Sequence, residues 1–174
     1  MKGFLPLVVF AGIVGALALG LTRDPRILPS ELINKPFPEF ELSDLHNADA
    51  TLTKDVLGDR VSLVNVFGSW CMACVQEHPK LMELSGSGVN IIGINWRDSR
   101  SKGLQWLDTH GNPYARVIYD PYSRLAIDLG ITGAPETFVV DRDGNIRYRH
   151  VGIVSDDVWK TRLRPAIEQI KAQS

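Results

Sequence analysis

Residues 61–74, VSLVNVFGSWCMAC, decide the fold of this chain. The first half, Val61 to Phe67, is rich in β-branched residues and almost wholly apolar, which predicts a central strand buried on both faces. The second half holds the only two cysteines, Cys71 and Cys74, spaced CxxC. A helix is expected to follow, from Met72 to Leu84. A CxxC pair set between a strand and a helix predicts a redox-active dithiol.

The length and composition of the chain are those of one globular domain. The chain has 174 residues, of which 44% are hydrophobic and 22% charged, and its net charge is −1. Without a basic excess or a basic run, nucleic acid is not an expected partner. Two cysteines are too few for a disulfide-rich scaffold, so a disulfide here is expected to take part in chemistry.

The N-terminal part predicts a tether. Phe4 to Leu21 is an unbroken run of apolar residues and glycines, 18 residues long. As a helix it would rise about 27 Å, close to the thickness of the hydrocarbon core of a bilayer. A cleaved signal peptide is the alternative, since residues 16–18 (ALA) loosely resemble a cleavage site. Because the apolar run continues past that site, the sequence favours a retained transmembrane anchor at residues 1–22, followed by a linker at 23–35.

The remaining residues, 36–174, predict a single α/β domain. Residues 37–42, a candidate strand, and residues 51–57, a candidate strand or turn, are expected to form a short β extension ahead of it. Further strands are expected at 89–96, 114–119, 137–140 and 146–151, and further helices at 101–110, 122–129 and from 156 onward. The link at 141–145 carries Asp-Gly and predicts a hairpin. Parallel crossovers followed by a hairpin and a last helix, interrupted by Pro165, imply a mixed sheet covered on both faces by helices.

The dithiol has assignable roles. A cysteine at a helix N-terminus has its thiolate stabilised by unpaired N–H groups, so Cys71 is expected to be the nucleophile. Cys74, one turn deeper, is expected to be the resolving thiol. Met72 and Ala73 offer no charge or histidine that would stabilise the thiolate further, which favours a reductant over a strong oxidant.

Other functions for the cysteines fit less well. One alternative is that both cysteines are buried and inert. The other is that they form part of a metal site with His78, a residue that we expect at the surface. A zinc site normally needs four ligands, and the sequence has no second CxxC. Haem attachment is not predicted, because Val75 and not a histidine follows Cys74. The sequence therefore predicts neither a metal nor a cofactor.

Glu77 lies on the same helix face as Cys74, three residues on. One interpretation makes it the proton acceptor for Cys74 during resolution. The other makes it a solvated acid favoured by the helix dipole. The residues alone do not decide between the two.

Residues 130–138, GITGAPETF, form the second informative stretch. The Ala134-Pro135 bond is either cis or, as in an ordinary loop, trans. In the cis case the preceding backbone is free to pair with an extended peptide. Glu136 is either a polar group beside the dithiol or an acid at a strand edge.

These motifs together resemble a known family. WCxxCxxEH at 70–78, GNPYA at 111–115, GxxGAPETF at 130–138 and IRYRH at 146–150, behind an apolar N-terminal run, are similar to the CcmG/DsbE proteins of c-type cytochrome maturation. The resemblance covers nearly all of residues 33–170. It implies a thioredoxin-like fold, a redox disulfide between Cys71 and Cys74, and a cis Pro135.

The resemblance also implies a function and partners. The family is anchored in the bacterial inner membrane with its domain in the periplasm, and it acts as a reductant. Electrons are expected from a membrane thiol transporter of the DsbD/CcdA type. They are expected to pass to apocytochrome c or to a CcmH-type partner, which keeps the haem-binding cysteines reduced. Trp70, Ala134, Pro135 and Glu136 are the implied substrate-binding residues, and Glu77 the implied acid beside the dithiol.

The chain departs from the family motif at two residues that affect the reduction potential of the dithiol. Met72-Ala73 replaces the Pro-Thr pair typical of the family, and these two positions tune the potential. Two rival functions are a broad periplasmic disulfide oxidase and a non-enzymatic module that docks apocytochrome.

Overall fold

The computed structural model describes residues 4–21 and 32–172. Helix α1 (Leu5–Leu21) comes first, and those of its large apolar side chains that the structure describes, among them Val8, Phe10 and Leu17, are exposed. Among the described residues, no helix is both long enough and apolar enough to span a membrane. Most of the predicted linker lies outside the described residues. Leu32 and Ile33, at its end, already pack against the domain.

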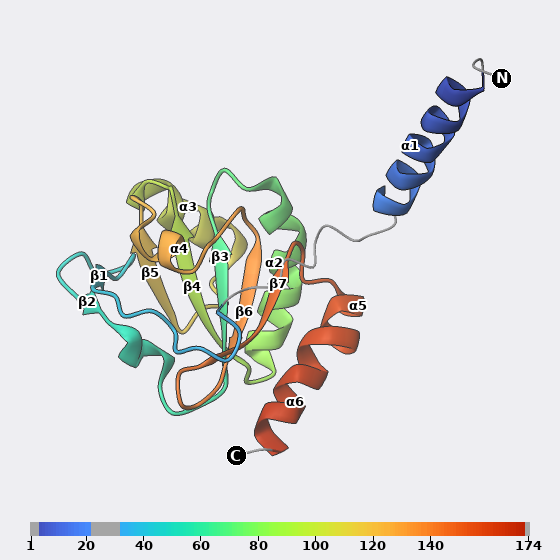
Figure 1. Ribbon diagram of the computed structural model, residues 1–174. Helices are drawn as coiled ribbons and strands as arrows, with labels where there is room; N and C mark the ends of the chain where they lie inside the picture. The colour runs from blue at the N-terminus through green and yellow to red at the C-terminus, as the bar shows by residue number, and fades with distance from the viewer. Residues whose placement is uncertain (1–3, 22–31, 173–174) are drawn as a thin grey trace.

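The domain is built on one mixed five-stranded sheet, with strand order β5-β4-β3-β6-β7 (Figure 1). The first three are parallel and the last two antiparallel to their neighbours. The strands are β3 (Ser62–Phe67), β4 (Asn90–Trp96), β5 (Arg116–Asp120), β6 (Glu136–Val140) and β7 (Ile146–Val151).

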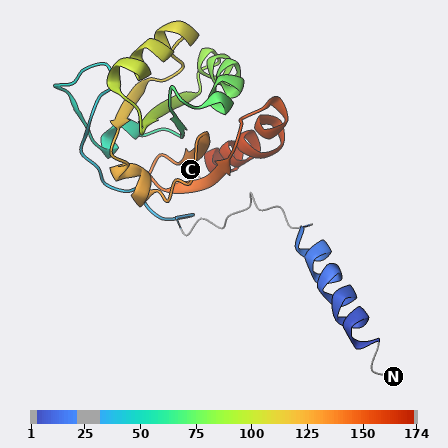
Figure 2. The ribbon, with the colours of Figure 1, turned by 90° about the horizontal axis from the view of Figure 1, so that it is seen from above.

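Every residue of β3 is buried, as expected for a central strand, and its side chains alternate between two cores. Leu63 and Phe67 point into the core under α2 (Met72–Gly86) and α3 (Arg100–His110), which also includes residues of the C-terminal helix. Val64 and Val66 point into the opposite core, which is covered by α4 (Arg124–Asp128) and the N-terminal extension. Figure 2 shows these two layers on either side of the sheet.

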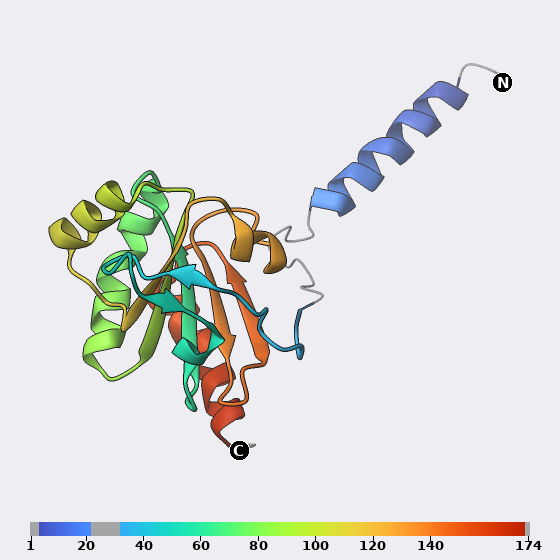
Figure 3. The ribbon, with the colours of Figure 1, turned by 90° about the vertical axis from the view of Figure 1, so that its left-hand side faces the viewer.

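The N-terminal extension agrees with its prediction at 51–57, which form a short strand and a turn, and differs from it at 37–42. Only Leu42–Ser43 (β1) and Thr51–Leu52 (β2) pair as strands, followed by a 3-10 turn, η1 (Lys54–Leu57). The extension crosses one face of the sheet (Figure 3). Phe37 and Phe40 are buried there as core side chains. Their alternation therefore reflects core packing rather than strand pairing, and the prediction of a strand over 37–42 was wrong.

The C-terminal segment comprises α5 (Asp156–Val158), a π-helical turn η2 (Trp159–Leu163) and α6 (Arg164–Ala172). Pro165 has no N–H group and so cannot donate the ordinary helical bond to residue 161. The turn before it is widened: the N–H of Arg164 donates to the carbonyl of Trp159, five residues back. The predicted interruption at Pro165 is thus present as a π-turn. The hairpin link at 141–145 is also confirmed.

Other boundaries moved by a few residues. β5 begins at Arg116 rather than at Tyr114, α4 is shorter than predicted, and α2 runs on to Gly86 and continues through Pro79.

Candidate redox-active dithiol site

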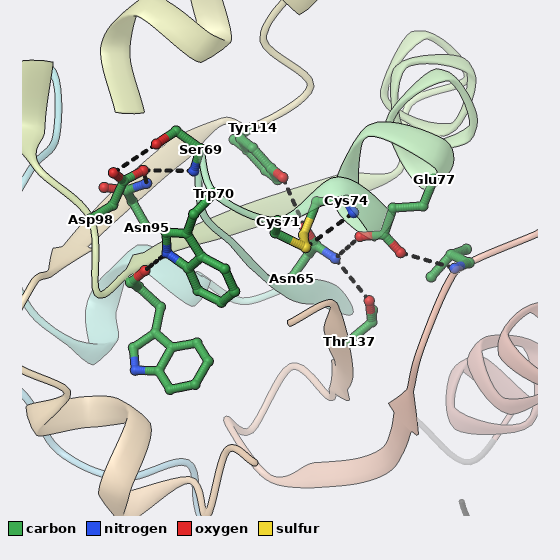
Figure 4. The surroundings of a disulfide bond; sticks show 12 residues. Asn65, Ser69, Trp70, Cys71, Cys74, Glu77, Asn95, Asp98, Tyr114 and Thr137 are labelled. Atoms are coloured by element: carbon green, nitrogen blue, oxygen red, sulfur yellow. Dashed lines mark hydrogen bonds between the residues drawn. A yellow bond between two sulfur atoms is a disulfide. The ribbon is translucent and has the colours of Figure 1, made fainter. Parts of the chain in front are cut away.

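The dithiol lies where β3 ends and α2 begins, as predicted. Cys71 is the N-cap of α2 and is joined to Cys74 by a disulfide with an S–S distance of 2.11 Å. The backbone N–H of Cys74 donates to the Cys71 sulfur over 3.1 Å (Figure 4). Such an N–H group would stabilise a thiolate at Cys71 once the disulfide is reduced. Residue Cys71 is 5% exposed and Cys74 1%, so Cys71 is the sulfur that a partner can reach more easily.

Glu77 lies under the dithiol with its carboxylate inside the protein. Its Oε1 accepts from the Asn65 amide at 2.8 Å and its Oε2 from the Val154 N–H at 2.9 Å. The residue is only 1% exposed, which excludes a solvated acid on the helix surface. Burial raises the pKa of Glu77 from 4.5 to about 7, against the lowering effect of the two hydrogen bonds. A carboxyl group with this pKa can both accept and release a proton near neutral pH.

A buried polar network, which sequence reasoning missed, holds Glu77. The Asn65 amide also donates to the Thr137 hydroxyl at 3.0 Å, and its Oδ1 accepts from the Tyr114 hydroxyl at 2.8 Å (Figure 4). Burial, with the nearby Glu77 as a smaller cause, raises the pKa of Tyr114, so its hydroxyl stays a donor. The signal in the sequence was the single asparagine inside the apolar run at 61–67.

The segment just before Cys71 is held by the end of β4 and the residues that follow that strand. The buried Asp98 carboxylate accepts from the Ser69 N–H at 2.7 Å and from the Ser69 hydroxyl at 2.8 Å. The Trp70 indole N–H donates to the Trp96 carbonyl at 3.2 Å. The Trp70 ring lies directly against Gly68. A Cβ at residue 68 would be only 2.5 Å from the indole nitrogen, so a larger residue there would displace the ring. Trp70 remains 49% exposed beside the dithiol, where a bound substrate would touch it.

The Ala134-Pro135 bond is cis, as the resemblance implied. The Pro135 carbonyl accepts from the Gly152 N–H at 2.9 Å, so the loop is joined to the segment after β7. A groove of about 810 Å³ lies between this loop, the start of α2 and the α5 segment, and Ala73, Ala134 and Pro135 line it. It is placed to take an extended peptide beside the dithiol.

Glu136 does not line this groove. Its side chain is fully buried and forms an ion pair with Arg149 at 2.7 Å. Its other oxygen accepts from the N–H and the hydroxyl of Thr132, each at 2.8 Å, and from the Gly133 N–H at 3.1 Å. The geometry therefore makes Glu136 a residue that fixes the shape of the loop.

The expectation that His78 lies at the surface was wrong. It is 3% exposed, its Nε2 lies 3.0 Å from the Gly111 carbonyl, and its ring meets that of Trp106 edge-on. The reason is that α3 and the Gly111 loop pack over this face of α2. Burial lowers the pKa of His78. Within residues 4–21 and 32–172, no cluster of three potential metal ligands is present.

Comparison with known proteins identifies the family. The Redoxin family matches residues 32–163. A thiol:disulfide interchange protein DsbE from Allochromatium vinosum is 45% identical over 167 residues, covering 95% of this chain and 92% of that protein. The chain belongs to the DsbE family. DsbE from Escherichia coli K12 is 40% identical over 176 residues, covering 98% of this chain and 95% of that protein.

The fold agrees with this assignment. A secreted thiol-disulfide isomerase from Corynebacterium glutamicum, a solved structure, is 26% identical with a TM-score of 0.65, covering 76% of this chain and 85% of that one. The predicted thioredoxin-like fold is confirmed. Membership of the DsbE family, together with the Cys71–Cys74 disulfide, makes the chain a thiol-disulfide oxidoreductase.

Proposed function

We propose that this DsbE-family chain is a membrane-anchored periplasmic reductant that keeps the haem-binding cysteines of apocytochrome c, or of an intermediate partner, reduced for haem attachment. The observation that carries the proposal is the placement of a buried carboxyl, Glu77, under a CxxC dithiol at the start of α2. This arrangement supplies a nucleophile, a resolving thiol and a proton acceptor within one helical stretch.

The reaction begins with the reduced dithiol. The Cys71 thiolate attacks a disulfide of the target, forms a mixed disulfide and releases the first target sulfur as a thiolate. Glu77 then accepts the proton of the Cys74 thiol. The Cys74 thiolate attacks the Cys71 sulfur, which releases the second target thiolate. Two electrons have moved to the target, and the Cys71–Cys74 disulfide of the structure is the product.

The direction of electron flow rests on the residues between the cysteines. Strong oxidants owe their potential to a stabilised thiolate. Met72 and Ala73 bring no charge to the Cys71 sulfur, so its reduced form lacks that extra stabilisation. This supports a reductant and argues against a broad disulfide oxidase.

Location and partners follow from the family resemblance. We propose that residues 1–22 hold the chain in the bacterial inner membrane, with residues 36–174 in the periplasm. The apolar run from Phe4 to Leu21 supports this proposal. The proposed electron donor is a membrane thiol transporter of the DsbD/CcdA type. The proposed acceptor is apocytochrome c or a CcmH-type protein.

The deciding experiment uses full-length protein carrying Cys74→Ser, expressed in a bacterium that makes c-type cytochromes. Cys71 should accumulate in a mixed disulfide with the acceptor, and mass spectrometry should find the partner's linked cysteine. A Cys71→Ser, Cys74→Ser protein is the control and should trap nothing. Trapping of many unrelated secreted proteins would contradict a dedicated role.

Two further measurements address the rival functions. The first is the reduction potential of the Cys71–Cys74 dithiol/disulfide couple. A value of about −120 mV, as for a strong oxidant, would refute the reductant role. Normal cytochrome maturation with Cys71→Ser would show that the domain acts as a docking module.

A further inference from the structure

Trp96, at the end of β4, contacts the exposed Trp70 beside the dithiol, Arg97, and the loop between β5 and α4. The Trp70 ring packs edge-on against the Trp96 ring, with centroids 5.7 Å apart. The Arg97 guanidinium lies over the Trp96 ring at 5.6 Å. The Trp96 indole N–H donates to the Ser123 hydroxyl at 2.9 Å. Trp96 itself is buried, and the exposed side chains of Trp70 and Arg97 pack against its ring.

The loop between β5 and α4 completes this surface. Asp120 joins this loop to Arg97, the residue after β4. The Asp120 carbonyl accepts from the Arg97 N–H at 3.2 Å, and its carboxylate accepts from the Arg124 N–H at 2.7 Å. Tyr122, between these contacts, is 80% exposed. We call Trp70, Arg97, Tyr122 and Arg124 the aromatic-arginine surface.

Two features set this surface apart from ordinary exterior. In the described part of the chain, three non-glycine residues have a positive φ, and two of them are Arg97 (49°) and Ser123 (60°), both contacts of Trp96. Such backbone strain is concentrated at functional sites. Arg97 and Arg124 are exposed, and neither forms an ion pair within residues 4–21 and 32–172. Tryptophan, tyrosine and arginine are also the residue types that dominate binding energy at protein interfaces.

We propose that the aromatic-arginine surface docks a protein partner that carries acidic side chains next to its reacting cysteine. The proposal rests on the redox function proposed above. Trp70 directly precedes Cys71 and is exposed, so a protein whose sulfur reaches Cys71 comes close to Trp70. The exposed guanidinium of Arg97, which packs on the same Trp96 ring as Trp70, and that of Arg124 on the adjoining loop then favour carboxylates on that protein and raise its rate of encounter. A lipid headgroup could meet the same cations, but contact with lipid would cover the side on which partners reach the dithiol.

The test uses full-length Cys74→Ser protein and two synthetic peptides. Each peptide has one cysteine, linked as a mixed disulfide to thionitrobenzoate. One peptide carries aspartates on both sides of the cysteine and the other carries asparagines. The Cys71 thiolate attacks the peptide sulfur, a Cys71–peptide disulfide forms, the old disulfide breaks, and coloured thionitrobenzoate leaves as a thiolate.

The measured quantity is the ratio of the two second-order rate constants, aspartate peptide over asparagine peptide. At low ionic strength we expect a ratio of about ten, and a fall towards one at about 0.5 M salt. With Arg97→Gln and Arg124→Gln added, the ratio should fall to about one at any salt concentration.

The matched control carries Arg60→Gln and Arg142→Gln. It removes the same charge from two exposed arginines at the opposite end of the sheet, where both line a separate pocket. In this control the ratio of the two rate constants should equal that of the Cys74→Ser protein with all its arginines. Equal reduction in both double variants would show that only net charge matters, and would overturn the proposal.

The remaining outcomes are also decisive. If both peptides react at equal rates in the parent, the acidic-partner proposal is refuted while the redox function stands. If neither peptide reacts, Cys71 is not a nucleophile and both proposals fail. If the ratio is one and the Arg97, Arg124 variant loses binding to phosphatidylglycerol vesicles, the surface contacts lipid and the proposal is overturned.

Discussion

Replacing Glu77 by Gln should change how the stability of the oxidised protein depends on pH. Gln keeps the size of the side chain and can accept the hydrogen bond from Asn65 or Val154, but it cannot ionise. Glu77 must lose its proton inside the protein, where burial disfavours the charged form. Between its unfolded and folded pKa values, the folded protein therefore holds a proton that the unfolded chain has released.

The size and sign of the effect follow from the two pKa values. They are 4.5 for the free side chain and about 7 in the folded protein. Because one pKa unit is worth about 1.4 kcal/mol, the parent should lose about 3 kcal/mol relative to Glu77→Gln as the pH rises from 4.5 to 7. Well below pH 4.5 and well above pH 7, where Glu77 has the same charge in the folded and unfolded states, the difference between the two proteins should be constant. His78 titrates in both proteins, so its contribution cancels in the difference.

The assay is denaturant unfolding of the disulfide-bonded proteins at half-unit steps from pH 4 to 8. The quantity of interest is the difference in unfolding free energy between parent and variant. Glu41→Gln, which removes an exposed carboxylate, is the control for lost surface charge. Parent minus variant, this difference should fall as the pH rises. A difference that stays constant, or that rises with pH, would refute the argument that burial raises the pKa of the Glu77 carboxyl.

Three other substitutions test the packing around the dithiol. Tyr114→Phe removes the donor to the Asn65 amide oxygen and leaves it buried without that partner, so denaturant unfolding should show a loss of about 1–3 kcal/mol; no loss would mean that the network adds nothing. Arg149→Gln leaves the Glu136 carboxylate buried without its cation, for an expected loss of about 3–5 kcal/mol, measured in the same way; a loss below about 1 kcal/mol would contradict the ion pair. Gly68→Ala should displace the indole ring that lies across it, seen as a changed tryptophan fluorescence spectrum, whereas an unchanged spectrum would show that the ring lies elsewhere.

The sequence predicted the sheet well because its signals are local. The apolar run at 61–67 specifies a strand buried on both faces, and the CxxC after it marks the start of a helix. Asp-Gly in the 141–145 link specifies a hairpin by itself. Errors came at 37–42, where alternating aromatic and polar residues resemble a strand although the phenylalanines fill a core.

The site was only partly predictable because its side chains meet across the sheet. Asn65, Tyr114 and Thr137 belong to separate segments, and no spacing along the chain announces that their polar groups converge on Glu77. His78 shows the same limit: its burial depends on α3 and the Gly111 loop, which lie more than twenty residues further on. Residues near the cysteines could be named in advance, but the contacts that govern their protonation could not.

The hydrogen bond from Val154 to Glu77 has a consequence for substrate binding. Val154 follows the stretch 150–153 that lines the peptide groove, so a peptide lying there touches the backbone next to that donor. If binding lengthens the bond, the carboxylate loses one of the two contacts that oppose its protonation. The proton affinity beneath the dithiol then depends on whether the groove is occupied. A bound peptide that lengthened this bond would therefore raise the pKa of Glu77 further and favour transfer of the Cys74 proton to it.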